Sequence, residues 1–491
     1  MAISLLIAAG TGGRAEVANR PNPEPVRDLL QIYGIDDQSI GYVVYDIAAR
    51  KRLAARGSDR FFIPASTMKV PTTILALDSL GAEFRFDTAI ATTGSVRNGV
   101  LHGDLYLRGG GDPQLTHDDF EGFVARLKTL GIAKVAGKFV YDTTLYTGLD
   151  VLQPEQPDDA AYNPGIDALS INFNRVKVAW QTPKKPAPMN LTVSSVTDRA
   201  PIPIDFVTVA PAPPGTPAKY HFTFVPGKPN DAWLMATQIS RQGSAWLPVR
   251  RPALHAARVL QLMARQAGID LPDPKQGATP SDAAIVYRHG SPPLASSVEA
   301  MLKYSNNLMA EMVGLAAARK ATGQPVALKD SVEFMAKWFA TRAPETNWSG
   351  MVWDNHSGLS PFARMTPDQM LAVLLIADRS GAKAPRIDSV LRDYRYFPAL
   401  DREKRPALAD WRVAAKTGTM DYARTLAGFI TTTDNRRLAF AIFQIDQQGR
   451  KVKDGIAERA DKVGLARPRA WRDRARGLEQ ALVRDWMTGR Y

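Results

Sequence analysis

Three short strings of residues, spread over most of the chain, constrain its fold more than any other feature. They are Ser66-Thr67-Met68-Lys69, Ser305-Asn306-Asn307 and Lys416-Thr417-Gly418, in that order. At ordinary residue usage, a Ser-x-x-Lys or Ser-x-Asn match arises roughly once or twice by chance in a chain of this length, whereas Lys-Thr-Gly arises in about one such chain in ten. The strings therefore carry information through their order and their local context.

The first string lies at the predicted start of a helix. Pro64 sets the entry, and an apolar stretch then continues to Leu80 and stops at Gly81, which predicts a helix with Ser66 near its N-terminus. Lys69 follows one turn later on the same face of that helix. The sequence therefore predicts that the Ser66 hydroxyl and the Lys69 amine lie side by side.

The other two strings also have a definite context. Ser305 falls in a short loop between two predicted helices, at residues 297–304 and 308–321. Lys416 precedes two apolar runs, at residues 426–430 and 438–443, which are predicted to be adjacent buried strands.

Two further matches lack such a context. Ser380-Gly381-Ala382-Lys383 follows the end of a predicted helix and contains a glycine that breaks it, and Ser170-Ile171-Asn172 lies in an alternating stretch that predicts a strand. Neither places a serine at the start of a helix. Both are therefore interpreted as chance matches for the catalytic motifs.

The first two strings supply the groups that serine acyl transfer needs. A serine hydroxyl is a weak nucleophile until a base removes its proton. Lys69 can be that base only while its amine is neutral, and both burial and the like charge of Lys416 would lower its pKa. Ser305 can pass a proton toward a leaving amine, and Asn307 can both donate to and accept from a substrate peptide bond.

The third string supplies substrate-binding groups. Lys416 and the hydroxyls of Thr417 and Thr419 can hold a carboxylate, and Gly418 lets a substrate lie against the strand. The backbone N–H groups of Ser66 and Thr419 would form an oxyanion hole, in which one donor is typically worth about 3 kcal/mol.

Composition narrows the remaining possibilities. The chain has 491 residues and no cysteine, which excludes disulfides, thiolate catalysis and Cys-ligated metals. Its six histidines form no HExxH pair, which disfavours a zinc hydrolase. No metal or other cofactor is expected. The net charge of +13 favours polyanionic partners, but no nucleic-acid-binding module is found, and nucleic acid is not an expected partner.

The three motifs in this order resemble the signature that penicillin-binding proteins share with serine β-lactamases. The chain as a whole resembles the D-alanyl-D-alanine carboxypeptidase/endopeptidases, the class C low-molecular-mass penicillin-binding proteins. Further stretches carry this resemblance, namely residues 103–107, 111–116, 168–172, 291–294, 357–360 and 426–429. The resemblance implies catalytic roles for Ser66, Lys69, Ser305, Asn307 and Lys416, and substrate binding by Thr417, Gly418 and Thr419.

The spacing of the motifs separates subfamilies. From Ser66 to Ser305 the chain runs 239 residues (305 − 66), a much longer gap than in β-lactamases or simpler carboxypeptidases. The resemblance implies an α/β (α+β) catalytic domain, an antiparallel sheet flanked by helices, formed by residues 21–85 and 281–491. It also implies an inserted domain at 86–280 that contains a smaller nested domain at about 175–245.

The implied activity is hydrolysis of D-Ala-D-Ala bonds through an acyl-enzyme on Ser66, with peptidoglycan as substrate and β-lactams as acylating ligands. Two alternatives stay open. One is a serine β-lactamase, which the long insertion disfavours, and the other is a penicillin-binding sensor or scaffold with little turnover. The balance between carboxypeptidase and endopeptidase activity, the specificity for stem-peptide side chains and the oligomeric state also stay open.

The two ends of the chain bear on localisation. The apolar residues 3–9, followed by small residues, are typical of a secretory signal within residues 1–18, although they lack a positively charged start. A periplasmic or otherwise exported location is therefore expected. The last predicted helix has one apolar stripe, which is expected to pack on the sheet, so at most peripheral membrane association is expected. This stripe consists of Trp471, Ala475, Leu478, Leu482 and Trp486.

Overall fold

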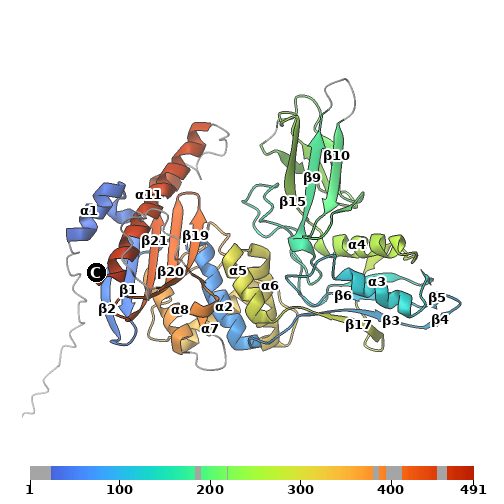
Figure 1. The fold of residues 1–491 in the computed structure, drawn as a ribbon, viewed down its shortest axis with the longest axis horizontal. Coiled ribbons are helices and arrows are strands. Elements are labelled where there is room, and N and C mark those ends of the chain that lie inside the picture. Colours follow the sequence, from blue (N-terminus) through green and yellow to red (C-terminus); the bar gives the residue numbers. More distant parts are fainter. Residues whose placement is uncertain (1–23, 183–188, 218, 380–385, 394–411, 451–461) are drawn as a thin grey trace, which may run out of the picture.

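The computed structural model describes residues 24–182, 189–217, 219–379, 386–393, 412–450 and 462–491. The expected secretory signal at residues 1–18 and the chance match at Ser380 lie outside these ranges. The described chain forms two bodies that lie side by side, and a pair of β-sheets rises from the second body (Figure 1).

The first body is built on a six-stranded antiparallel sheet with the order β18-β19-β20-β21-β1-β2. Its strands, in this order, are Arg392–Asp393, Arg412–Met420, Ala423–Thr431, Arg437–Ile445, Ile40–Asp46 and Lys51–Arg56. Helices cover both faces of this sheet (Figure 1). The adjacent strands expected at residues 426–430 and 438–443 are confirmed.

One face of the sheet packs against the N- and C-terminal helices, α1 (Glu24–Tyr33) and α11 (Lys462–Met487). The apolar stripe of α11 is buried against this face, as the sequence predicts. Its exposed fractions are 5% at Trp471, 0% at Ala475 and Leu478, and 1% at Leu482 and Trp486. No helix of the described residues is long and apolar enough to cross a bilayer.

The other face carries the helices that hold the motif residues. They surround α2 (Lys69–Leu80), which directly follows the short 3₁₀ turn η2 (Ala65–Met68) in the chain. The neighbouring helices are α5 (Leu294–Tyr304), α6 (Asn307–Thr322), α7 (Leu328–Arg342) and α8 (Pro367–Arg379). The short helix α9 (Ile387–Val390) packs against α5 and β19. Because the sheet is buried on both faces, its central strands are continuous apolar runs in the sequence.

The second body contains a mixed five-stranded sheet with the order β16-β8-β6-β3-β17. Its strands, in this order, are Pro274–Gln276, Phe139–Asp142, Leu105–Arg108, Asp87–Thr92 and Ala284–Gly290. The helices α3 (Phe120–Thr129) and α4 (Pro252–Gln266) share an apolar core with it. A small sheet joins β4 (Ser95–Arg97), β5 (Val100–His102) and β7 (Lys134–Val135).

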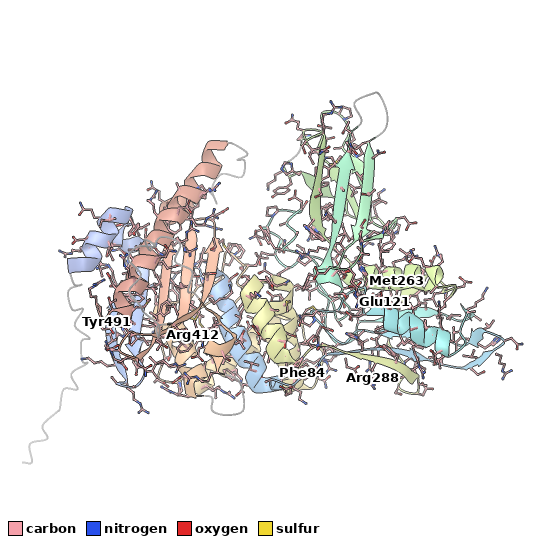
Figure 2. All side chains as sticks on the ribbon, viewed as in Figure 1. Phe84, Glu121, Met263, Arg288, Arg412 and Tyr491 are labelled. Atoms are coloured by element: carbon pink, nitrogen blue, oxygen red, sulfur yellow. The ribbon has the colours of Figure 1, made fainter. Side chains whose placement is uncertain are left out.

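The chain leaves and re-enters the first body along two paired strands. The first of them, β3, begins at Asp87, and the last, β17, ends at Gly290, which is paired with Asp87. The sequence-based boundary at residue 281 assigned β17 to the catalytic domain, whereas its pairing places it in the sheet of the second body. Phe84 and Arg288, labelled in Figure 2, mark this junction.

Two further sheets rise from the second body (Figure 1) and share a core of their own. One has the order β11-β10-β9-β15, with strands Ile202–Pro203, Asn190–Ser195, Arg175–Gln181 and Gln242–Pro248. The other has the order β12-β14-β13, with strands Thr208–Pro211, Ala232–Met235 and Phe222–Phe224. Their strands span about the residues for which the sequence predicts a nested domain.

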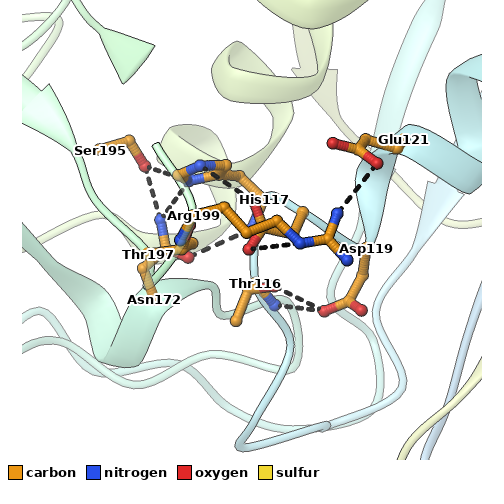
Figure 3. Close-up of polar contacts among 9 residues, drawn as sticks. Thr116, His117, Asp119, Glu121, Asn172, Ser195, Thr197 and Arg199 are labelled. Atoms are coloured by element: carbon orange, nitrogen blue, oxygen red, sulfur yellow. Dashed lines mark hydrogen bonds and ion pairs between the residues drawn. The ribbon is translucent and has the colours of Figure 1, made fainter. Parts of the chain in front are cut away.

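A buried polar cluster connects these two sheets to the body from which they rise (Figure 3). Asn172 Nδ2 donates to Ser195 Oγ on β10 at 2.6 Å, and His117 Nδ1 lies 3.1 Å from the same oxygen. Asn172 Nδ2 also lies 2.9 Å from His117 Nδ1. All three residues are buried, so their hydrogen bonds satisfy polar groups that have no access to solvent.

The chain turns at Gly103 between β5 and β6, which belong to different sheets, and a Cβ atom at Gly103 would lie 1.9 Å from the carbonyl oxygen of Thr93. The structure differs from one local expectation. The stretch at residues 170–172 leads into a 3₁₀ turn with left-handed residues, the first of which is Asn172 at φ +51°. The expected strand there is therefore wrong.

Candidate active site

The expected nucleophile, Ser66, lies in the 3₁₀ turn η2 immediately before α2. Pro64 enters this turn with φ −71°, and Ala65 takes the left-handed φ of +45°. Thr67 Oγ1 fastens the turn by donating to the Pro64 carbonyl at 2.6 Å. Ser66 is partly exposed, whereas its neighbours Ala65 and Thr67 are buried, so its hydroxyl is the group that this turn presents.

The amine of Lys69 is held by three oxygen atoms. Its Nζ lies 3.0 Å from Ser66 Oγ, 2.8 Å from Asn307 Oδ1 and 2.8 Å from the carbonyl oxygen of Ser357. Lys69 is completely buried. The predicted proximity of the Ser66 hydroxyl and the Lys69 amine is therefore present in the structure.

Burial and charge determine the protonation of Lys69. Loss of solvation is the largest cause that lowers its pKa well below the usual value, and the positive charge of Lys416 lowers it further. The carboxylate of Glu311 acts in the opposite direction. The net effect favours the neutral amine, which is the form that can accept a proton.

The Ser305-Asn306-Asn307 string forms the tight connection between α5 and α6. Ser305 ends α5 in the left-handed conformation, with φ +54°, and accepts a hydrogen bond from Lys416 Nζ at 2.9 Å. Asn306 caps α6, because its side chain accepts from Met309 N at 3.1 Å. The cap starts the helix at Asn307, so the Asn307 side chain projects from its first turn.

Asn307 connects the two bodies. Its Oδ1 accepts from Lys69, and its Nδ2 donates at 3.0 Å to the carbonyl oxygen of Tyr162, which belongs to the second body. The donor and the acceptor of this amide therefore each have a defined partner. Tyr162 OH in turn donates to Gln156 at 3.0 Å.

The strand β19 brings the third string to the edge of the site. Lys416 Nζ donates to Ser305 Oγ and, at 2.7 Å, to the carbonyl oxygen of Thr417. A Cβ atom on Gly418 would lie 2.1 Å from Thr425 Oγ1 and 3.0 Å from Ser66 N. A larger residue would therefore push β19 away from the nucleophile. Thr419 is the next residue of the same strand, opposite Arg424 in the register.

The structure thus places five of the sequence-predicted residues in two hydrogen-bonded groups, one around Lys69 and one around Lys416. They are Ser66, Lys69, Ser305, Asn307 and Lys416. Thr417, Gly418 and Thr419 follow on β19. Among the described residues, no group of three His, Asp or Glu side chains has the spacing of a metal site.

Sequence reasoning missed Glu311 and the backbone of residues 356–357. Glu311 is completely buried in α6 and accepts from the N–H groups of His356 and Ser357 at 2.9 and 2.8 Å. The carbonyl oxygen of Ser357 is the third acceptor for Lys69. One signal was available: Glu311 is the only charged residue among residues 307–318, an otherwise apolar part of the helix.

Comparison with known proteins extends this description. The sequence profile of the D-Ala-D-Ala carboxypeptidase 3 (S13) family matches residues 25–463. The D-alanyl-D-alanine carboxypeptidase DacB of Haemophilus influenzae is 26% identical over 439 residues, which cover 85% of this chain and 87% of the relative. The D-alanyl-D-alanine carboxypeptidase of Actinomadura sp. (strain R39) is also 26% identical, with coverage of 91% and 85%.

The fold is similar to that of a solved structure. The crystal structure of penicillin binding protein 4 (dacB) from Haemophilus influenzae aligns with a TM-score of 0.72 and 23% identity, over 94% of this chain and 99% of that chain. A second structure of that protein, complexed with a β-lactam, gives a TM-score of 0.68. The α/β fold class expected from the sequence is therefore confirmed. With a profile match over most of its length, the chain belongs to the D-Ala-D-Ala carboxypeptidase 3 (S13) family.

Proposed function

We propose that the protein hydrolyses D-Ala-D-Ala bonds in peptidoglycan stem peptides and D-Ala cross-links, through an acyl-enzyme on Ser66, and that β-lactams acylate the same serine. One observation carries this proposal. The buried amine of Lys69 lies 3.0 Å from Ser66 Oγ, and its pKa is lowered by burial and by Lys416. This arrangement is what activation of a serine hydroxyl requires.

In the acylation step, Ser66 Oγ attacks the carbonyl carbon of the penultimate D-alanine while its proton passes to the lone pair on Lys69 Nζ. The C–O bond forms, and the electron pair of the carbonyl moves to its oxygen. The backbone N–H groups of Ser66 and Thr419 are the proposed donors to that oxyanion. Gly418 supports this assignment, since it allows β19 to lie close to Ser66 N.

Collapse of this intermediate breaks the C–N bond and releases the terminal D-alanine or the cross-linked strand. The leaving amine takes a proton from Ser305, and the proton that Lys69 took from Ser66 replaces it, so Lys69 is neutral again. The Ser305 hydroxyl also accepts a hydrogen bond from Lys416. Lys416, Thr417 and Thr419 hold the free carboxylate of the substrate. Water then attacks the ester carbonyl while Lys69 takes one of its protons. The bond between the acyl carbon and Ser66 Oγ breaks, and Oγ takes that proton back from Lys69, which lies 3.0 Å away.

The decisive experiment compares products. Purified protein is incubated with cross-linked peptidoglycan, with a D-Ala-D-Ala pentapeptide and with a penicillin. Free D-alanine and shortened cross-links support the proposal. Rapid hydrolysis of penicillin without peptide cleavage would instead identify a β-lactamase, and covalent labelling without turnover would identify a sensor.

An exported location follows from the proposed substrate, which lies outside the cytoplasmic membrane. The apolar residues 3–9 support it at the level of the sequence. Fractionation of cells that express the full chain, with antibody detection in the periplasmic, membrane and cytoplasmic fractions, tests this proposal. A protein confined to the cytoplasm could not reach peptidoglycan.

A further inference from the structure

The hydrogen bonds around Lys69 raise a question about its neutral form. A protonated amine can donate three hydrogen bonds, to Ser66 Oγ, Asn307 Oδ1 and the Ser357 carbonyl. A neutral amine has two N–H donors and one lone pair. Only one assignment lets Lys69 act as a base, in which the two donors bind Asn307 and Ser357 and the lone pair points at the Ser66 hydroxyl.

Two acceptors therefore orient the lone pair, and each acceptor needs support. Asn307 Oδ1 is fixed because the other end of its amide donates to the Tyr162 carbonyl. The Ser357 carbonyl lies in a loop with no regular secondary structure. A loop carbonyl can serve as a fixed acceptor only if the peptide groups beside it are held.

Glu311 holds these peptide groups. Its two carboxylate oxygens accept from two successive N–H groups, Oε2 from His356 and Oε1 from Ser357. The His356 carbonyl is held separately by Thr72 of α2, whose hydroxyl donates to it at 2.9 Å. The carboxylate thus links α6 to the loop at the residue whose carbonyl faces Lys69.

We infer that Glu311 is a positioning residue for the amine of Lys69. This inference rests on the proposed role of Lys69 as the base. Glu311 fixes the Ser357 carbonyl, and that carbonyl directs the lone pair of Lys69 at Ser66. Small displacements of a reacting group are costly, because a shift of about 1 Å can lower a rate about a hundredfold.

The carboxylate of Glu311 also acts by its charge. Burial raises the pKa of Glu311 to about 7, and its hydrogen bonds and the charge of Lys69 oppose this rise. The charged groups that face Lys69 are Lys416 from β19 and Glu311 from α6. The buried imidazole of His356 is neutral above its pKa of about 3. Removing the negative charge of Glu311 should therefore lower the pKa of Lys69.

These two effects give Glu311→Gln a signature that loss of structure alone does not produce. The substituted amide would keep one acceptor oxygen, but its NH2 group would face an N–H group. We expect the plateau of the acylation rate to fall about tenfold or more, because the lone pair is misdirected. At the same time, the acidic limb of the pH–rate profile should move to lower pH, because the amine no longer faces the negative charge that Glu311 carries above its pKa of about 7.

Glu311→Asp separates the effect of the negative charge from the effect of side-chain length. Aspartate keeps the negative charge but is one methylene shorter, so it cannot hold both N–H groups in the same way. Its plateau should fall, while its acidic limb stays close to that of the wild type. The matched control is Asp112→Asn, which removes another buried carboxylate with a pKa of about 7 from the second body. Both its plateau and its limb should stay unchanged.

The measurement is stopped-flow acylation by a chromogenic cephalosporin over a range of pH from acid to alkaline. Rates are normalised to the active-site fraction found by labelling with fluorescent penicillin, and thermal melts confirm folding. If Glu311→Gln shows a wild-type plateau and limb, or loses rate only in proportion to its active fraction, Glu311 is not a positioning residue. Release of D-alanine from a D-Ala-D-Ala pentapeptide by the wild type, and its loss in Ser66→Ala, would show in the same series that the proposed function survives such a result.

Discussion

Two polar clusters of this protein contain similar residue types, yet only one is arranged for chemistry. The active site joins Ser66, Lys69 and Asn307. The cluster in Figure 3 joins Ser195, His117 and Asn172, with the carboxylate of Asp118 3.6 Å from His117 Nε2. By composition alone, the second cluster contains a serine, a histidine and an acid.

The difference lies in access and in charge. Ser195 is completely buried, so no substrate can reach it, whereas Ser66 is partly exposed. Burial lowers the pKa of His117, and the neutral ring satisfies its neighbours. Lys69 is a buried amine with a second amine, Lys416, close by. Hydrogen bonds alone therefore stabilise the structure around Ser195. Ser66 becomes a nucleophile because its hydroxyl is accessible and lies beside an amine whose charged form is destabilised.

The different roles of the two clusters are tested most directly by replacing each serine in turn. Ser66→Ala should abolish labelling by fluorescent penicillin while the fold survives, since no other serine is expected to be activated. Ser195→Ala should keep full labelling. It should lower the free energy of unfolding by about 1–3 kcal/mol, because Asn172 and His117 lose a buried partner. Gel labelling and chemical denaturation measure the two effects. Labelling of the first variant, or its loss in the second, would reverse the roles of the two clusters.

The motif residues were predictable because their chemistry is local in sequence. Ser66 and Lys69 lie one turn apart, and Asn306 caps the helix that begins at Asn307. Their contacts with the rest of the site were not predictable. The Ser357 carbonyl is a backbone group, which any residue could supply, and Glu311 recognises two backbone N–H groups. No side-chain pattern specifies such partners.

The fold was likewise predictable where local sequence patterns define it and unpredictable where contacts between distant parts of the chain define it. Long periodic or apolar segments, such as the stripe of α11 and the strands β20 and β21, were predictable from their patterns. The end of the second body was not, because the strand β17 is assigned by its pairing with β3, which lies far earlier in the chain. The turn at Gly103 also depends on a contact with another strand end, at Thr93.

The second prediction tests the charge of the base. Lys69→Arg keeps a cation in place, but arginine stays protonated and cannot accept the proton of Ser66. Acylation by penicillin should fall about a hundredfold or more, which is the usual contribution of a general base. The acylation rate of the wild type should rise with pH as the amine loses its proton. Near-normal acylation of the variant at neutral pH would show that Lys69 is not the base.

The third prediction concerns the second body, which contacts Asn307 of the site through the Tyr162 carbonyl. Gln153 and Gln156 of the same body bond the loop at Asn355 and Leu359. Sequence reasoning placed every group needed for acylation outside the insertion, but Asn307 donates to Tyr162. Excising residues 87–290 and joining the ends with a short linker should therefore slow acylation about tenfold, in line with one lost hydrogen bond of about 1.4 kcal/mol.

Cleavage of polymeric peptidoglycan by the same variant should fall much further, because remote contacts help to position the scissile bond. The ratio of the two activities, measured before and after excision in a variant shown by circular dichroism to be folded, is the quantity to compare. Equal proportional losses would mean that the second body has no role specific to the polymer.

The last prediction compares one buried histidine in each body. Burial lowers the pKa of His356 to about 3 and that of His255 to about 4, whereas an unfolded histidine has a pKa of about 6.5. Below about pH 6.5 the unfolded chain therefore binds protons that the folded chain does not. Each histidine then lowers the free energy of unfolding by about 1.4 kcal/mol per pH unit, down to about pH 3 for His356 and about pH 4 for His255.

His255 allows a clean test of this dependence. Neither of its ring nitrogens has a hydrogen-bond partner among the described residues, and its ring packs edge-to-face on Phe206 at 5.5 Å between centroids. His255→Phe should therefore keep the packing and reduce the loss of stability between about pH 6.5 and about pH 4. His356 bonds Ser331 through Nε2 at 2.7 Å, so replacing it should also cost stability at neutral pH. Urea denaturation of both variants at mildly acidic and at neutral pH measures the two slopes. An unchanged slope for His255→Phe would show that His255 is protonated as readily in the folded protein as in the unfolded chain.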